Sequence, residues 1–172
     1  GCDESITAGS EKIEFKQKLT YENNQLCIDG TPVSNNTLPA GDYYVDSDIN
    51  LSEAIQIQGK VNLCLNGHVI KQTGTNKNVI TVLAGAELSI CDCKPAETHT
   101  GLATDIVDLT GCLITGGNLN YTGATSAING AGICNNGTLN LYSGTIAGNK
   151  STSNETGTNI KYANGCGVYS SN

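Results

Sequence analysis

Closely spaced carboxylates are the residues of this chain with the clearest capacity for chemistry. Asp42, Asp46 and Asp48 occur in GDYYVDSD, and Asp105 and Asp108 occur in TDIVD. Alternation along a strand places Asp46 and Asp48 on one face, and two acids at a suitable separation are the minimum for cleaving a glycosidic bond. The same acids also suit solvated turns and Asx caps, and we favour that interpretation.

The histidines and lysines add little to a catalytic set. His68 in LCLNGHVI is a lone histidine beside a turn, which is usually structural, and His99 in AETHT is expected in a loop. A lysine acts as a base only when its pKa is lowered, and Lys60, Lys71 and Lys77 occur among ordinary polar residues.

The charge balance argues against nucleic acid as a partner. The formal net charge is −7, and all nine basic residues are lysines. A chain with neither arginine nor a basic cluster lacks the electrostatic footprint that binds a phosphate backbone. No stretch approaches 18 consecutive apolar residues, so we also expect no membrane-spanning helix.

The cysteines leave several interpretations open. They occur at Cys2, Cys27, Cys64, Cys91, Cys93, Cys112, Cys134 and Cys166. No C-x-x-C pair is present, so we expect no structural zinc site and no other metal centre. Buried thiols and scattered disulfides are equally compatible with the pattern. Cys2, followed by Asp-Glu-Ser, is either the lipid-bearing cysteine of a bacterial lipoprotein or an ordinary cysteine near a frayed terminus.

Two internal repeats indicate how the chain positions these residues. NGAGICNNG at 129–137 recurs as NGCGVYSSN at 164–172, an offset of 35 residues (164 − 129). KVNLCLNG at 60–67 superposes on ELSICDCK at 87–94, an offset of 27 residues (87 − 60), with Val61 on Leu88, Leu63 on Ile90 and Cys64 on Cys91. Unequal offsets predict one repeating coil with loops of variable length.

Short alternating apolar runs between turn residues predict strands rather than helices. The chain has 21 Gly, one Phe and no Trp or Met, so its core must consist of small and branched side chains. Recurring asparagines in the turns form ladders from coil to coil or simply tolerate left-handed backbone conformations; the candidates are Asn66, Asn129, Asn149 and Asn164.

The N-terminal part differs from the rest. KIEFKQKLTYE at 12–22 places Ile13, Phe15, Leu19 and Tyr21 on one side of an extended chain, with charged residues on the other. We therefore predict an all-β fold, a right-handed parallel β-helix (a single-stranded solenoid) at 38–172 with an extended N-terminal capping segment at 1–37.

The quoted motifs resemble a known group of proteins. LPAGDYYVDSDINLSEAIQIQGKVNLCLNGHVI, VITVLAGAELSICDC and NGAGICNNGTLNLYSGTIAGN are similar to the right-handed parallel β-helix repeats of bacterial cell-surface proteins, especially those of Gram-positive gut bacteria. The likeness covers 38–172. It implies a pectate-lyase-like solenoid that is secreted or lies at the cell surface.

The resemblance also raises an enzymatic alternative, a polysaccharide lyase or glycoside hydrolase of this fold or a fragment of one. Lyases of the fold combine a Ca²⁺ site with an arginine, and this chain has no arginine. We expect no cofactor, Ca²⁺ entering only with the enzyme alternative. If the chain is an enzyme, the candidate catalytic acids are Asp46, Asp48, Asp105 and Asp108.

Our leading expectation is a non-enzymatic adhesin, stalk or glycan-contacting module. The flat faces of a solenoid suit a polysaccharide or a surface glycan, and tyrosine rings either stack on sugars or fill the corners of coils. The candidate ligand-binding residues are Tyr43, Tyr44, Tyr121, Tyr142 and Tyr169. The final unit stops within a coil at Asn172, and an uncovered strand edge favours end-to-end self-association or marks a piece of a longer surface protein. A purely structural spacer is the third alternative.

Overall fold

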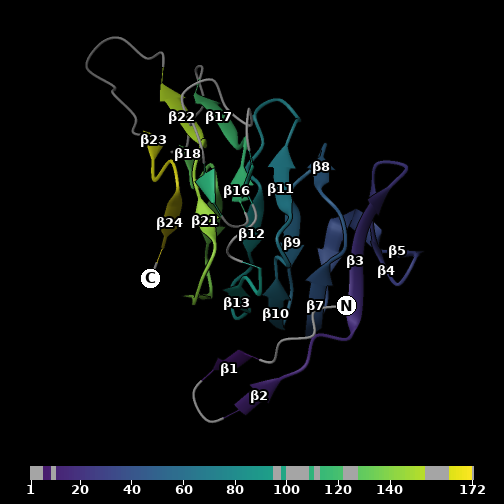
Figure 1. Cartoon of the computed structure of the whole chain (residues 1–172). Helices are drawn as coiled ribbons and strands as arrows, with labels where there is room; N and C mark the ends of the chain where they lie inside the picture. The colour runs from purple at the N-terminus through teal and green to yellow at the C-terminus, as the bar shows by residue number, and fades with distance from the viewer. Residues whose placement is uncertain are drawn as a thin grey trace.

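The computed structural model describes residues 6–8, 11–94, 98–99, 109–110, 113–121, 128–153 and 163–171. These residues form strands, turns and one short 3₁₀ segment, η1 (Ser34–Asn36), without an α-helix. The strands belong mainly to three sheets whose pairings are mostly parallel (Figure 1). The predicted all-β class with parallel sheets is therefore confirmed.

Sheet 1 is the largest and contains both parallel and antiparallel pairs. Its order is β20 (Thr138–Leu141), β13 (Glu87–Cys91), β10 (Lys60–Cys64), β7 (Gly41–Val45), β3 (Gln17–Glu22), β4 (Gln25–Ile28) and β5 (Thr31–Pro32). The pairs from β20 to β3 are parallel, whereas β3, β4 and β5 form an antiparallel meander at one edge.

Sheets 2 and 3 are parallel throughout. Sheet 2 has the order β21 (Thr145–Ile146), β16 (Leu113–Thr115), β11 (Val69–Gln72) and β8 (Ile49–Leu51). Sheet 3 has the order β24 (Val168–Ser170), β19 (Ile133–Asn135), β12 (Ile80–Val82), β9 (Ile55–Ile57) and β6 (Thr37–Leu38).

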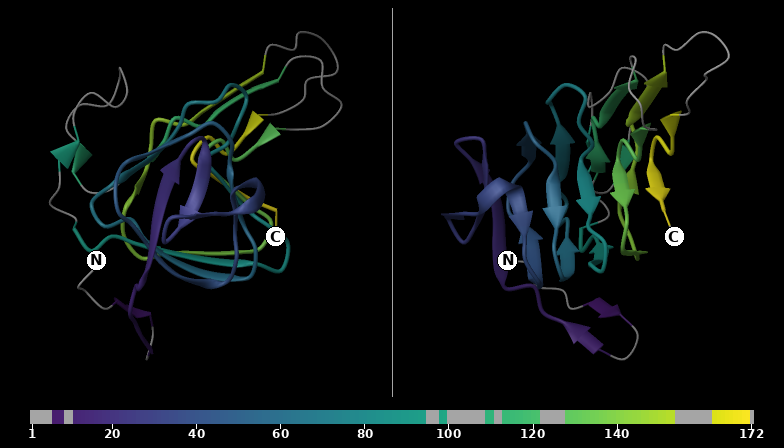
Figure 2. Two further views of the ribbon diagram at one scale, coloured as in Figure 1. Left: turned by 90° about the vertical axis from the view of Figure 1, so that its right-hand side faces the viewer. Right: turned by 180° about the vertical axis from the view of Figure 1, so that it is seen from behind.

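The chain visits the three sheets in a constant order. From β6 it passes to β7, β8 and β9, and the cycle of sheets 3, 1 and 2 then repeats to β24. We call one such cycle a pass. Strands of successive passes lie side by side, as the right-hand view of Figure 2 shows. Parallel sheets are stable when their apolar faces are covered. Here the inward side chains of the three sheets must cover one another by filling the centre.

Additional short strands lie in the connections between sheets. The pair β14 (Thr98–His99) and β15 (Leu109–Thr110) occurs between β13 and β16. Between sheets 2 and 3, β17 (Asn118–Tyr121) pairs with β22 (Lys150–Ser153), and β18 (Ile128–Asn129) pairs with β23 (Ala163–Asn164). These insertions explain why the two repeat offsets differ.

The strand register follows both sequence repeats. Val61 pairs with Leu88, Leu63 with Ile90 and Cys64 with Cys91. In the second repeat, Ile133 pairs with Val168 and Asn129 with Asn164. Both predicted superpositions are confirmed, because residues at matching positions of successive passes are direct neighbours across parallel strands.

Columns of aliphatic side chains form the core. In sheet 1, Leu63 and Ile90 are adjacent and have no exposed surface. Sheets 2 and 3 contribute matching columns, including Ile70 with Ile114 and Ile80 with Ile133. The columns end at β20, β21 and β24, and Leu141 of β20 and Val168 of β24 are exposed there.

The predicted N-terminal segment contains two distinct parts. Leu19 of β3 and Leu26 of β4 are fully buried in the main core, and β3 pairs with β7. Before β3, the chain forms a hairpin of β1 (Ile6–Ala8) and β2 (Glu11–Ile13). Residues 14–16 connect this hairpin to β3 and pack on the outside of sheet 1. We call residues 6–8 and 11–16 the N-terminal arm; Figure 1 shows β1 and β2 beside the lower ends of β7 and β10.

Candidate functional site

The outer face of sheet 1 presents a row of polar side chains. Because side chains alternate along a strand, Asn62 points outward between the buried Val61 and Leu63. Asn62 is aligned with Asp42 on one side and Ser89 on the other. Its Nδ2 donates to Asp42 Oδ1 over 2.7 Å, which fixes both side chains.

The row continues across the sheet to its last strand. Asn140 is aligned with Ser89, and its Nδ2 lies 3.3 Å from Ser89 Oγ and 3.1 Å from Glu87 Oε1. Hydrogen bonds thus connect outward side chains of adjacent passes. They create a polar strip that runs across the strands, parallel to the direction in which the passes stack.

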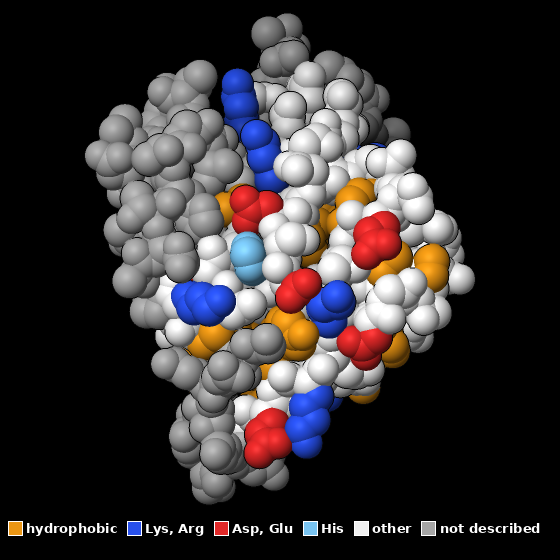
Figure 3. All heavy atoms as spheres, turned by 45° about the vertical axis from the view of Figure 1, so that its right-hand side comes forward, with side chains coloured by type: hydrophobic (Ala, Val, Ile, Leu, Met, Phe, Trp, Pro, Cys, Tyr) orange, Lys and Arg blue, Asp and Glu red, His pale blue; other side chains and the backbone are white. Residues whose placement is uncertain are grey.

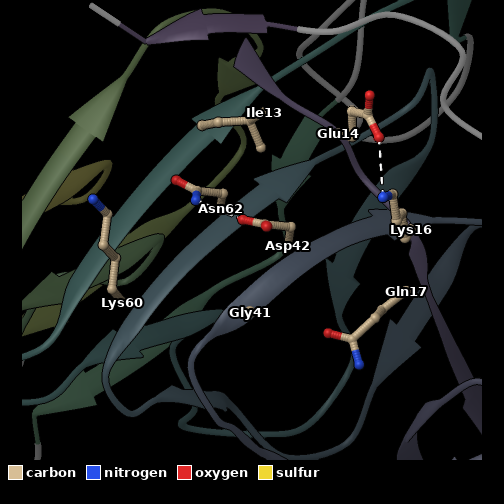
Figure 4. A pocket seen from close by; sticks show the side chains of 8 residues that line it. All are labelled: Ile13, Glu14, Lys16, Gln17, Gly41, Asp42, Lys60 and Asn62. Carbon is tan, nitrogen blue, oxygen red and sulfur yellow. Dashed lines mark hydrogen bonds and ion pairs between the residues drawn. The ribbon is translucent and has the colours of Figure 1, made fainter. Parts of the chain in front are cut away.

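A groove of about 790 Å³ lies between the N-terminal arm and the start of this strip. Its lining is Ile13, Glu14, Lys16, Gln17, Gly41, Asp42, Lys60 and Asn62. Figure 4 shows the arm residues on one side of the hollow and the residues of β7 and β10 on the other. Volumes of about 300–1,000 Å³ are usual for sites that take small ligands or segments of polymers.

The charges around the groove balance. Glu14 and Lys16 of the arm form an ion pair of 3.0 Å, and Lys60 and Asp42 face the hollow from the sheet. Acidic and basic side chains are also interspersed on the face shown in Figure 3 rather than gathered by sign. The groove therefore offers hydrogen-bond donors and acceptors together with one cation, Lys60, that extends from the sheet.

A small hydrophobic cluster holds the arm against the sheet. Phe15 is 6% exposed and packs on Cys64, Cys91 and Cys93, with Ile13 and Tyr44 beside it. Cys64 and Cys91 are register neighbours on the outer face of sheet 1. The arm is thus anchored next to the groove that it helps to form.

The structure separates the five predicted tyrosines. Tyr43 is 1% exposed and points into the core, where its hydroxyl donates to Pro39 O over 3.0 Å, so its ring offers no surface to a sugar. Tyr44 is half-buried beside Phe15, and Tyr169 is half-buried on sheet 3. Tyr142 is 51% exposed. The side chain of Tyr121 lies outside the described residues.

The predicted acids occupy separate structural positions. Asp46 is 3.7 Å from Lys18 Nζ in an exposed ion pair. Asp48 Oδ1 accepts from the Val69 N–H over 3.0 Å and lies 3.3 Å from His68 Nδ1, which ties two successive passes together. Asp105 and Asp108 lie outside the described residues. His99, expected in a loop, is instead in the short strand β14, and its side chain is not among those described.

The cysteines that the structure describes are thiols. None of Cys27, Cys64, Cys91, Cys93, Cys134 and Cys166 forms a disulfide. Burial raises the pKa of the Cys134 thiol, and a hydrogen bond from Asn136 partly offsets that rise. Within the described residues no cluster of three or more His, Cys, Asp or Glu side chains could hold a metal ion. Cys2 and Cys112 lie outside them.

Among the predicted turn asparagines that the structure describes, Asn66 alone has the left-handed backbone, and the side chains of Asn66 and Asn149 bond across passes to backbone groups. Asn66 has a φ of 52° and also donates from Nδ2 to Val45 O of the preceding pass over 2.9 Å. Asn149 accepts from the Gly117 N–H and donates to Ile114 O, again across passes. Their amides bond to backbone groups of the neighbouring pass.

The sequence interpretation missed the groove itself. Asn62 and Lys16 are not among its candidate residues, and it treats Asp42 only as a candidate catalytic acid and Lys60 only as a weak base. The repeat alignment already places Asn62 opposite Ser89 on the outward side, so that polar strip was available from the sequence. The position of the arm was not, because Phe15 and Cys91 are far apart in the chain.

The chain matches no protein-family model, and no significant match was found among curated proteins or among solved structures. In the described part of the chain, no helix has the length and apolar character needed to cross a membrane. Proposals about the function of this chain therefore rest on its own sequence and structure.

Proposed function

We propose that the chain is a right-handed parallel β-helix module that binds an extended glycan on the outer face of sheet 1 without cleaving it. The module belongs to a secreted or cell-surface protein of a bacterium, as the resemblance of its repeats implies. The groove between the N-terminal arm and β7 and β10 is the observation that carries the proposal.

The sheet topology supports the β-helix assignment. The chain cycles through three sheets, and each strand pairs in parallel with its counterpart one pass later. Connections between parallel strands of one sheet are right-handed in nearly all proteins, which supports the handedness. The meander β3–β5 supports the capping role, because it buries Leu19 and Leu26 at the start of the stack.

The chemistry of the outer face supports a glycan as ligand. A polysaccharide presents hydroxyl groups at regular intervals, and the strip from Asp42 to Asn140 presents amide, hydroxyl and carboxylate groups at the strand spacing of about 4.8 Å. Tyr142 directly follows β20 at the end of this strip and is about half exposed. An aromatic ring so placed stacks on the apolar face of a sugar.

The state of the groove acids supports binding rather than hydrolysis. Glu14 is paired with Lys16, and Asp42 accepts from Asn62. A glycosidase needs one carboxylic acid held protonated and a second carboxylate available to a water or to the sugar. Carboxylates already paired with a cation or an amide suit recognition of hydroxyl groups better than proton transfer.

Binding to polysaccharides in solution tests this proposal. Affinity electrophoresis or calorimetry with polygalacturonate, xylan and a neutral glucan should detect retention, and Lys60→Ala and Tyr142→Ala should each weaken it about fivefold, since a lost hydrogen bond or ring contact is worth about 1 kcal/mol. Lys71→Ala, a strand lysine of sheet 2, is the matched control and should bind like the unmodified chain.

Two outcomes would contradict the proposal. Equal losses for Lys60→Ala and Lys71→Ala would place the ligand away from the groove. Release of reducing ends or unsaturated products at enzymatic rates, with or without added Ca²⁺, would replace binding by the lyase or hydrolase alternative.

A further inference from the structure

A second hollow of about 490 Å³ lies on another side of the molecule, against sheet 3 and the meander β3–β5. Its lining is Asn24, Gln25, Val33, Asn35, Asn36, Glu53, Ala54, Gln56, Lys77 and Asn78. Six of these ten residues carry side-chain amides. Neither the candidate tyrosines nor the groove under the N-terminal arm contributes to it.

We propose that this hollow, the amide pocket, is a separate binding site for a neutral saccharide unit. It does not rest on the glycan binding proposed for the outer face of sheet 1, because the two lining sets have no residue in common.

The walls of the amide pocket are fixed by bonds to the core. Asn36 Oδ1 accepts from the Leu26 N–H over 2.9 Å, and its Nδ2 donates to Glu53 O over 3.4 Å, which joins the meander to the β8–β9 connection. Elsewhere in the lining, Asn78 Nδ2 donates to Ile80 O and Thr81 Oγ1 over 2.8 and 2.7 Å. The pocket is therefore built before any ligand arrives, which reduces the entropy cost of binding.

Four further amides remain available to a ligand. Within the described residues, no hydrogen bond engages the side chains of Asn24, Gln25, Asn35 and Gln56. Gln56 is on the outward side of β9, between the buried Ile55 and Ile57. Each amide supplies a donor and an acceptor, which is the combination that neighbouring sugar hydroxyls require.

Tight turns place three of the lining asparagines. Asn35 and Asn36 have φ values of 53° and 50°, and Asn24 has a φ of 61° in the two-residue turn between β3 and β4. Asparagine adopts this left-handed conformation more readily than other residues with a side chain. The turns thus bring three amide side chains to the same hollow.

The charges of the lining argue against an ionic ligand. Glu53 and Lys77 form an ion pair of 2.7 Å and neutralise one another. A Ca²⁺ ion prefers several carboxylates, and Glu53 is the one carboxylate of this lining. An anionic ligand would find a single lysine that is already paired. Val33 and Ala54 provide small apolar surface for the ring carbons of a sugar.

A titration of the ¹⁵N-labelled chain with methyl glycosides of glucose, galactose, mannose, xylose and N-acetylglucosamine tests the amide pocket. Sugars should be added up to about 50 mM, well above the roughly millimolar Kd that a few hydrogen bonds produce. At least one sugar should give saturable shifts of the side-chain amides of Gln25 and Gln56. The double variant Gln25→Ala/Gln56→Ala should weaken that binding at least about tenfold.

Gln58→Ala is the matched control, because Gln58 is exposed and lies two residues beyond Gln56 outside the pocket. The control should bind like the unmodified chain. Absence of saturable shifts with every sugar would overturn the proposal, and so would shifts that persist in the double variant. Shifts confined to the backbone amides of Lys60 and Asn62 would support the outer-face site and refute the amide pocket, so the two proposals fail separately.

Discussion

Truncation of two leucines in one core column provides a sharp test of the stacked arrangement. Leu63 and Leu141 occupy equivalent inward positions of sheet 1, with Ile90 between them in register. Leu63 is fully buried with neighbours on both sides, whereas Leu141 lies on the last strand and is 49% exposed. Leu63→Ala and Leu141→Ala therefore remove the same atoms from two different environments.

The expected magnitudes follow from burial. Leu→Ala removes roughly three methylene equivalents at about 0.8 kcal/mol each, or about 2.4 kcal/mol for a fully buried side chain. At Leu63 an enclosed cavity adds to this, so the free energy of unfolding should fall by about 3–4 kcal/mol. At Leu141 half of the surface is already exposed and no closed cavity forms, so the loss should be about 1 kcal/mol.

Urea unfolding followed by far-ultraviolet circular dichroism measures the difference. With an m-value of about 2 kcal/mol/M, the midpoints of the two variants should differ by about 1 M urea. The comparison holds where both variants keep the m-value of the unmodified chain, because a changed m-value signals a loss of two-state unfolding. Equal midpoints for the two variants would refute the assignment of Leu141 to an uncovered end of the column.

Two further predictions concern the N-terminal arm and the buried tyrosine. Phe15→Ala should speed alkylation of Cys64 at least about tenfold, because Phe15 packs over that thiol. Mass spectrometry of the Cys64 peptide measures the rate, and Tyr142→Ala is the control that should leave it unchanged. An unchanged rate in Phe15→Ala would contradict the packing. Burial, and secondarily the charge of Asp42, raise the pKa of Tyr43 above its ordinary value of 10.0, so the folded state holds this proton more tightly than the unfolded state. The stability that Tyr43 contributes is then complete below pH 10 and is lost as pH rises through the raised pKa; unfolding midpoints measured across alkaline pH should show this fall, and a Tyr43→Phe variant with an equally steep fall would contradict it.

The repeat register was predictable because stacking makes equivalent positions direct neighbours. Val61 and Leu88 share a pattern in the sequence for the same reason that they share a column in the core. The αL conformation of Asn66 was predictable on similar grounds, since a short polar side chain in a turn tolerates positive φ.

The direction of the two adjacent tyrosines was not predictable. In DYYV either Tyr43 or Tyr44 could face inward, and a shift of one residue in pairing exchanges the two faces of a strand. Pairing of Tyr43 with Leu63 decides the matter and places Tyr43 in the core. Its hydroxyl is then satisfied by Pro39 O, a contact that no local pattern indicates.

The sequence by itself determined the class of the fold, the columns that stack and the alignment of Asn62 with Ser89 in the polar strip. These features depend on alternation and repetition, which are local or periodic properties of the chain. Only the tertiary structure decided where the N-terminal arm packs and which loops enclose the two hollows. Those contacts join residues such as Phe15 with Cys91, and Asn36 with Glu53, whose proximity depends on the path of the whole chain and has no periodic signal.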